Sequence, residues 1–122
     1  MIAAYHVTAE GRFKPYVRMT QAGKWVKREA QDYLASKDAL ALQFATSMLD
    51  RPCIPRGVPL IVDIHITHAG GFHHCDLDNQ AKAILDAAQG IVFEDDRWVD
   101  RLSCKRERGD ADLVQLYVRT VG

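Results

Sequence analysis

Residues 60–68, LIVDIHITH, carry the most restrictive pattern in the chain. Aliphatic residues occupy every second position, and the positions between them are mostly polar. A side-chain period of two is that of a β-strand, whereas an amphipathic helix repeats its apolar positions every three to four residues. The two alternating sets are Leu60, Val62, Ile64 and Ile66 on one side and Ile61, Asp63, His65 and Thr67 on the other. The pattern therefore predicts a strand over 60–68.

Three weaker patterns lie before this strand. Residues 2–8, IAAYHVT, alternate loosely and predict a first strand, whereas residues 9–25 are rich in Gly, Lys and Arg and predict a long, basic, exposed loop. Residues 27–49 contain neither Gly nor Pro, and their apolar residues follow a mostly helical period. We expect one long helix there, ended by the three prolines of residues 50–59.

Three further elements are expected after the strand. Residues 77–89 predict a second helix with Gly90 as its C-cap. Its core-facing stripe is expected to be Leu77, Ala81, Ile84, Leu85 and Ala88. Residues 97–108 and 112–121 predict two strands joined as a hairpin through GDAD at 109–112.

The order of these elements is β-α-β-α-β-β, which indicates an α/β (α+β) fold. We expect a single small domain over residues 1–122, with a mixed sheet of about four strands and two main helices. The 122 residues are 48% hydrophobic and 26% charged, as in ordinary globular domains. The formal net charge is zero, so overall charge predicts neither a nucleic acid nor a membrane partner.

The cysteines and the opening residues indicate the cellular compartment in which the protein is expected. Cys53, Cys75 and Cys104 form no CxxC pair, and the opening residues lack the apolar region of a secretory signal. No apolar run approaches the length of a membrane span. We therefore expect reduced thiols and a cytoplasmic protein without a membrane partner.

The stretch HHCDLDNQAKAILDA, residues 73–87, places acids at the start of the second helix. Asp76 and Asp78 can converge on one point, and Lys82 follows Asp78 by one helical turn. A third acidic group follows at residues 94–96. Neighbouring carboxylates repel one another unless a cation is present, and ligands that are all oxygen suit Mg²⁺ or Mn²⁺.

Three other interpretations compete with a Mg²⁺ or Mn²⁺ site in this stretch. Asp76 could be a helix N-cap and Asp78 an acid that favours the helix dipole, which requires no metal. A calcium EF-hand is excluded, because Ala81 and Ala87 stand where the loop needs Gly and Glu. Zinc has candidate nitrogen and sulfur ligands, but their spacing matches no zinc motif; these ligands are His65, His68, His73, His74 and Cys75.

Basic residues are concentrated in two parts of the chain. The first group is interleaved with Phe13, Tyr16 and Trp25, and the second follows the later strand. Such groups suit phosphate contact and base stacking, although each alone is more often a solvated face. The first contains Arg12, Lys14, Arg18, Lys24, Lys27 and Arg28, and the second Arg97, Arg101, Lys105, Arg106 and Arg108. Neither a P-loop nor GxGxxG occurs, so no nucleotide cofactor is expected.

The segment DLDNQAKAILDAAQGIVFEDDRWV, residues 76–99, resembles the RusA family of Holliday junction resolvases, which are phage- and prophage-associated endodeoxyribonucleases. The family pattern is an acidic D-L-D-N motif, a lysine, a short helix and an acidic pair before a valine-containing strand. This chain matches it at Asp76, Asp78, Asn79, Lys82, Asp95, Asp96 and Val99.

The resemblance implies a Mg²⁺- or Mn²⁺-dependent crossover junction endodeoxyribonuclease that acts in DNA recombination and repair. It implies a homodimer that binds branched four-way DNA and nicks two strands symmetrically. The resemblance assigns metal binding to Asp76, Asp78 and Asp96. It assigns catalysis to the same three residues and Lys82. Asp95 and Asn79 are additional candidates for the site. We expect DNA contacts from Arg18, Lys24, Lys27, Arg28, Arg101, Lys105 and Arg106.

Two departures from the family pattern concern the contacts with DNA. Residues 71–75 read GFHHC, where family members often carry several arginines. We therefore expect phosphate contact just before the D-L-D-N motif to be weaker, or to depend on pH through His73 and His74. Residues 9–16 replace a loop that the family builds with proline and asparagine. A non-catalytic junction-binding dimer of the same fold is one alternative, and a small zinc-binding interaction module is another.

Overall fold

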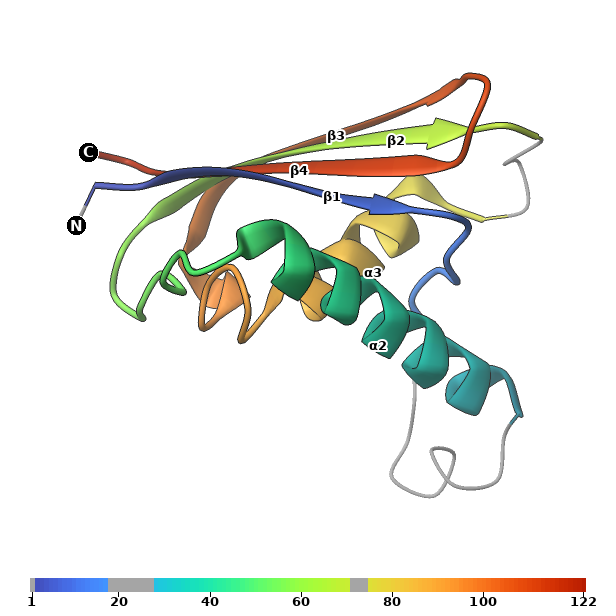
Figure 1. The fold of residues 1–122 in the computed structure, drawn as a ribbon, viewed down its shortest axis with the longest axis horizontal. Helices are drawn as coiled ribbons and strands as arrows, with labels where there is room; N and C mark the ends of the chain where they lie inside the picture. Colours follow the sequence, from blue (N-terminus) through green and yellow to red (C-terminus); the bar gives the residue numbers. More distant parts are fainter. Residues whose placement is uncertain (1, 18–27, 71–74) are drawn as a thin grey trace.

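The computed structural model describes residues 2–17, 28–70 and 75–122. Four strands form one mixed sheet, and the two α-helices lie on the same face of it (Figure 1). The elements are β1 (Ala4–Glu10), α2 (Arg28–Met48), β2 (Leu60–His68), α3 (Leu77–Ala88), the 3-10 helix η1 (Asp96–Trp98), β3 (Val99–Arg108) and β4 (Leu113–Thr120). The α+β class and the order β-α-β-α-β-β are confirmed.

The strand predicted over 60–68 has those bounds in the structure. The first strand lies two residues later than expected, so that Ala9 and Glu10 belong to β1 and not to a loop. The helix predicted over 27–49 is α2, and Lys27 lies outside the described residues. Helix α3 ends one residue earlier than expected, with Gln89 as C-cap and Gly90 after it at a φ of 86°, where a glycine is favoured.

The strand order is β1-β4-β2-β3, so the predicted hairpin of β3 and β4 is wrong. Strand β2 lies between them, parallel to β3 and antiparallel to β4. The connection at 109–112 instead crosses the end of β2, where the Gly109 N–H donates to the His68 carbonyl at 2.9 Å. A Cβ at Gly109 would collide with Cγ2 of Thr67, so a glycine permits this close crossing. Turn-forming residues specify a change of direction, but they do not specify the strand that pairs.

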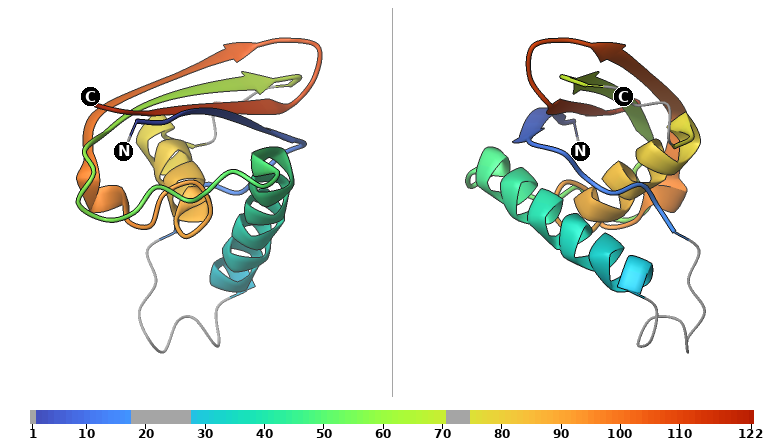
Figure 2. Two further views of the ribbon diagram at one scale, coloured as in Figure 1. Left: turned by 60° about the vertical axis from the view of Figure 1, so that its left-hand side comes forward. Right: turned by 90° about the vertical axis from the view of Figure 1, so that its right-hand side faces the viewer.

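The core lies between the sheet and the two helices (Figure 2). The aliphatic set of β2 faces it, and α2 contributes Tyr33, Leu40 and Phe44 at helical spacing. Two of the expected core residues of α3, Leu77 and Leu85, are only partly buried. The buried residues of α3 are Gln80, Ala81, Ala83, Ile84, Ala87 and Ala88. Helix α3 is therefore rotated about its own axis relative to the orientation that the predicted stripe implied. As a result, Leu77 and Leu85 line a pocket.

The other face of the sheet is not covered by either helix (Figure 2). We call it the open face; it carries the alternate residues of each strand, among them Asp63 and His65 of β2 and Tyr117 of β4. No helix in the described part of the chain is long and apolar enough to cross a bilayer.

Candidate active site

Helix α3 begins directly after Asp76, which stands at the N-cap position with an extended backbone. The Asp76 carbonyl accepts the Gln80 N–H at 3.2 Å. Its carboxylate makes no capping hydrogen bond to the described helix, so the interpretation of Asp76 as a side-chain cap is not supported. The carboxylate of Asp78, in the first turn, accepts the Asn79 N–H at 3.0 Å.

Lys82 lies one turn further along α3, and its ammonium contacts Asp86 and the ring of Tyr16. Nζ is 3.5 Å from a carboxylate oxygen of Asp86 and 4.9 Å from the ring centre of Tyr16. The hydroxyl of Tyr33, on α2, donates to the other Asp86 oxygen at 2.8 Å. Burial and the acceptor Asp86 raise the pKa of Tyr33, so the phenol keeps its proton. Contacts from α2 and from the segment after β1 therefore position Lys82, whose side chain is 48% exposed.

Asp96 is brought near α3 by the turn that follows the helix. Its backbone N–H donates to the side-chain oxygen of Gln89 at 2.9 Å. The preceding residue, Asp95, caps η1 by accepting the Arg97 N–H at 3.0 Å. The two halves of the acidic pair thus differ: Asp95 takes part in a local cap, and Asp96 starts the 3-10 helix beside the pocket.

One pocket of about 470 Å³ brings together Asp78, Lys82 and Asp96. The other residues of its lining are apolar or weakly polar: Leu77, Ala81, Leu85, Leu102 and Cys104. Burial raises the pKa of the Cys104 thiol to about 11, so this group is neutral near pH 7. Asp76, Asn79 and Asp95 are not part of the lining. The pocket is therefore an apolar cleft whose charged groups are two carboxylates and one ammonium.

The donor set of this pocket fits a hard divalent cation. Among the described residues no three His, Cys, Asp or Glu side chains converge closely enough to hold a metal by themselves. Mg²⁺, however, is usually bound through one or two carboxylates together with waters and substrate phosphates. Asp78 and Asp96 meet that requirement, and Asp76 precedes Asp78 by two residues.

The candidate zinc ligands do not gather in this way. His65 points to the open face, with Nε2 3.1 Å from Asp63, whereas His68 belongs to the opposite set of β2 side chains and contacts α3. These two histidines cannot share one ion, because the sheet separates them. His73 and His74 lie outside the described residues.

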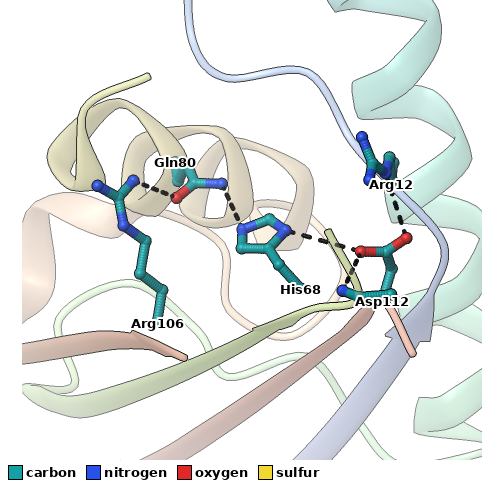
Figure 3. A network of polar contacts seen from close by, with 6 residues as sticks. Arg12, His68, Gln80, Arg106 and Asp112 are labelled. Carbon is teal, nitrogen blue, oxygen red and sulfur yellow. Dashed lines mark hydrogen bonds and ion pairs between the residues drawn. The ribbon is translucent and has the colours of Figure 1, made fainter. Parts of the chain in front are cut away.

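A polar network ties the start of α3 to the sheet (Figure 3). Arg106 of β3 donates to the Cys75 carbonyl at 2.8 Å and to the side-chain oxygen of Gln80 at 3.0 Å. The Gln80 amide nitrogen lies 3.0 Å from Nε2 of His68, and Nδ1 of His68 lies 3.7 Å from Asp112. Gln80 is 2% exposed, so the network replaces the water that its amide would otherwise bind.

Asp112 ends this network at the loop that crosses β2. The Ala69 N–H donates to its carboxylate at 3.0 Å, and Arg12 pairs with it at 3.3 Å. The hydrogen bond from Ala69 and the charge of Arg12 hold the pKa of Asp112 below its usual value. Sequence reasoning missed Gln80 and Asp112, because a glutamine on a helix and an aspartate in a turn are ordinary surface residues until the fold brings them together.

Four of the basic residues expected to contact DNA belong to the described part of the chain, and these four are dispersed. Arg28 begins α2 with its side chain 93% exposed, 4.0 Å from Asp32. Arg101 and Lys105 stand on the open face of β3, whereas Arg106 is half-buried in the network. Arg18, Lys24 and Lys27 lie outside the described residues.

Comparison with known protein families identifies a match over most of the chain. The model of the family described as Endodeoxyribonuclease RusA matches residues 7–119, which run from β1 to β4 and include the whole pocket. No curated protein matched the chain. A match over this length shows the family, and the chain belongs to the RusA family of endodeoxyribonucleases, enzymes of the Holliday junction resolvase type.

Proposed function

We propose that this protein is a structure-selective endodeoxyribonuclease that resolves four-way DNA junctions in recombination and repair, by divalent-metal-dependent hydrolysis of phosphodiester bonds. One observation carries the proposal: Asp78, Lys82 and Asp96 line a single pocket, although Asp96 lies beyond the end of the helix that carries the other two. Family membership supports DNA as the substrate.

The side chains of the pocket suggest a division of roles. Asp78 and Asp96, together with Asp76, which precedes Asp78 by two residues, would hold Mg²⁺ or Mn²⁺. A bound ion of this kind polarises the scissile phosphate and lowers the pKa of an attacking water. The Lys82 ammonium would stabilise the negative charge that develops on the phosphate oxygens. Its contacts with Asp86 and Tyr16 orient it before substrate arrives, which reduces the cost of reorganisation.

A four-way junction offers two equivalent strands for cleavage. A homodimer with two-fold symmetry would present two such pockets to them, one from each subunit. This dimer is part of the proposal.

The test is cleavage of a synthetic four-way junction in Mg²⁺ and in Mn²⁺. We expect Asp78→Asn and Asp96→Asn to lower the rate by about 100-fold or more, because each removes a charged ligand from the pocket. Asp38→Asn, on the exposed side of α2, is the matched control and should cleave like the wild type. Equal activity of Asp78→Asn and the wild type would sink the assignment.

Two further outcomes separate neighbouring functions. If the wild type binds junctions in EDTA but cleaves none in either metal, the protein is the non-catalytic junction-binding dimer. If unbranched duplex is cleaved as fast as the junction, the nuclease remains but the selectivity for junctions is lost.

A further inference from the structure

The open face of the sheet carries an ordered charge pattern. The strand registers align its side chains in four rows that run across the sheet, each written in the order β1, β4, β2, β3. Row one is Ala4, Arg119, Ile61, Arg101; row two is His6, Tyr117, Asp63, Ser103; row three is Thr8, Gln115, His65, Lys105; row four is Glu10, Leu113, Thr67, Glu107. The charge of successive rows therefore alternates: positive, negative, positive, negative.

The shape of the open face changes between the two halves of this pattern. A hollow of about 910 Å³ lies over rows one and two, and every residue of these two rows belongs to its lining. No residue of rows three and four does. This hollow therefore covers one half of the face and does not extend over the other half.

We propose that a second copy of this chain packs against the open face, related by a two-fold axis that runs across the strands between rows two and three. This rotation places row one against row four of the partner, and row two against row three. Arg101 then meets Glu107 of the partner subunit, and Asp63 meets His65 of the partner subunit. Aligned face-to-face packing is the common arrangement of two sheets, and a two-fold contact must be self-complementary.

The charges select this axis over the other two-fold arrangement. An axis parallel to the strands would place every row against itself. Glu10 would then face Glu107 of the partner subunit. Arg101 and Arg119 would lie in the same row as the two row-one arginines of the partner subunit. Like charges in contact disfavour association, whereas the pattern found here pairs every charged row with one of opposite sign.

The side chains of row two are already fixed within one subunit. The Ser103 hydroxyl donates to Asp63 at 2.6 Å, and the rings of His6 and Tyr117 stack at 4.2 Å. Ordered side chains lose little rotamer freedom on association, and tyrosine and arginine are enriched in subunit interfaces. The hollow over rows one and two would receive the side chains of rows three and four of the partner.

The arrangement has a consequence for the active sites. Strand β3 is an edge of the sheet, and its residues Leu102 and Cys104 line the pocket of Asp78 and Asp96. The proposed axis leaves the dimer at this edge, so the two pockets lie on either side of the axis. The proposal thus deepens the proposed homodimer and shares its premise that the chain acts as a dimer. It also assigns Arg101 and Lys105 to the subunit contact and not to DNA.

The test is charge exchange between Arg101 and Glu107, measured by sedimentation velocity and native mass spectrometry without DNA. Six residues apart on one strand, these side chains stand about 20 Å from each other and do not pair within a subunit. Arg101→Glu and Glu107→Arg each create two like-charged contacts per dimer. We expect each to raise the dimer dissociation constant by about tenfold or more.

Mixing the two variants in equal amounts provides the decisive result. In the heterodimer both contacts again join opposite charges, so we expect dimers to return, with the mass of one copy of each variant. Arg108→Glu is the matched control, because it makes the same change on the same strand but on the opposite face, and it should dimerise like the wild type. A monomeric wild type, dimeric single variants or a mixture that stays monomeric would overturn the proposal. Because no cleavage is measured, these outcomes are independent of whether the protein is a nuclease.

Discussion

The arginines of β3 differ in role according to the face on which each stands. Arg101 lies on the open face, whereas Arg106 faces α3 and donates to the Cys75 carbonyl and to Gln80. Cys75 directly precedes Asp76, so the guanidinium of Arg106 helps to fix the point from which the acidic residues start. An arginine in this position stabilises the fold, although its residue type alone suggested DNA contact.

Arg106→Ala is therefore expected to lower the free energy of unfolding by about 1–3 kcal/mol, because it leaves the buried Gln80 oxygen without this donor. Urea unfolding of the wild type and the variant measures the difference. Arg108→Ala, which removes an exposed arginine from the same strand, should stay within about 0.5 kcal/mol of the wild type. Equal losses in both variants would show that the network contributes nothing specific.

The candidate site could be predicted from the sequence only where its geometry is local. Asp78 and Lys82 are one helical turn apart, so a predicted helix suffices to place them together. That Asp96 joins them depends on how the turn after α3 folds back, and the sequence supported this only through resemblance to a family. Gln80 was expected outside the core stripe, and its burial follows from a rotation of α3 that the pattern of leucines and alanines did not specify.

At the scale of elements, the clearest sequence pattern was also the most reliable. Strand β2 has neighbours on both sides and one face on the core, so its alternation is strong and its bounds were confirmed. The pairing of β3 with β4 was wrong, because the four-residue connection Gly-Asp-Ala-Asp is equally suited to a hairpin and to a crossing over another strand. The difference lies in one close approach, that of Gly109 to β2.

Gly109→Ala tests that crossing. The new methyl group would meet Cγ2 of Thr67, so we expect a destabilisation of about 1–3 kcal/mol in thermal or urea unfolding. Thr67→Ser removes that Cγ2 and leaves the hydroxyl. The double variant Thr67→Ser/Gly109→Ala should therefore recover most of the loss relative to Thr67→Ser alone. A double variant as unstable as the sum of the two single changes would contradict a steric cause.

At the scale of the whole molecule, zero net charge conceals an uneven distribution. Acids gather at the pocket of α3 and η1, and cations are spread over other surfaces. The affinity for DNA depends on the local cations that replace counterions on the phosphates, and not on the net charge of the protein.

We therefore expect junction binding to weaken steeply with salt, with a slope of log affinity against log salt more negative than about −2, since each phosphate contacted contributes about −0.9. Fluorescence anisotropy of a labelled junction in EDTA, over a series of salt concentrations, gives the slope without cleavage. An affinity that does not change with salt would mean that phosphate contacts are not its source.

The position of β4 in the sheet has a consequence for synthesis of the chain. This last strand pairs with both β1 and β2, and its register joins Ala4 to Arg119. During translation β1, α2, β2 and α3 are all synthesised before β4, the strand that connects β1 to the rest of the sheet. The sheet can therefore close only after β4 has been synthesised, and a nascent or truncated chain that ends before residue 113 leaves the edges of β1 and β2 exposed to other chains.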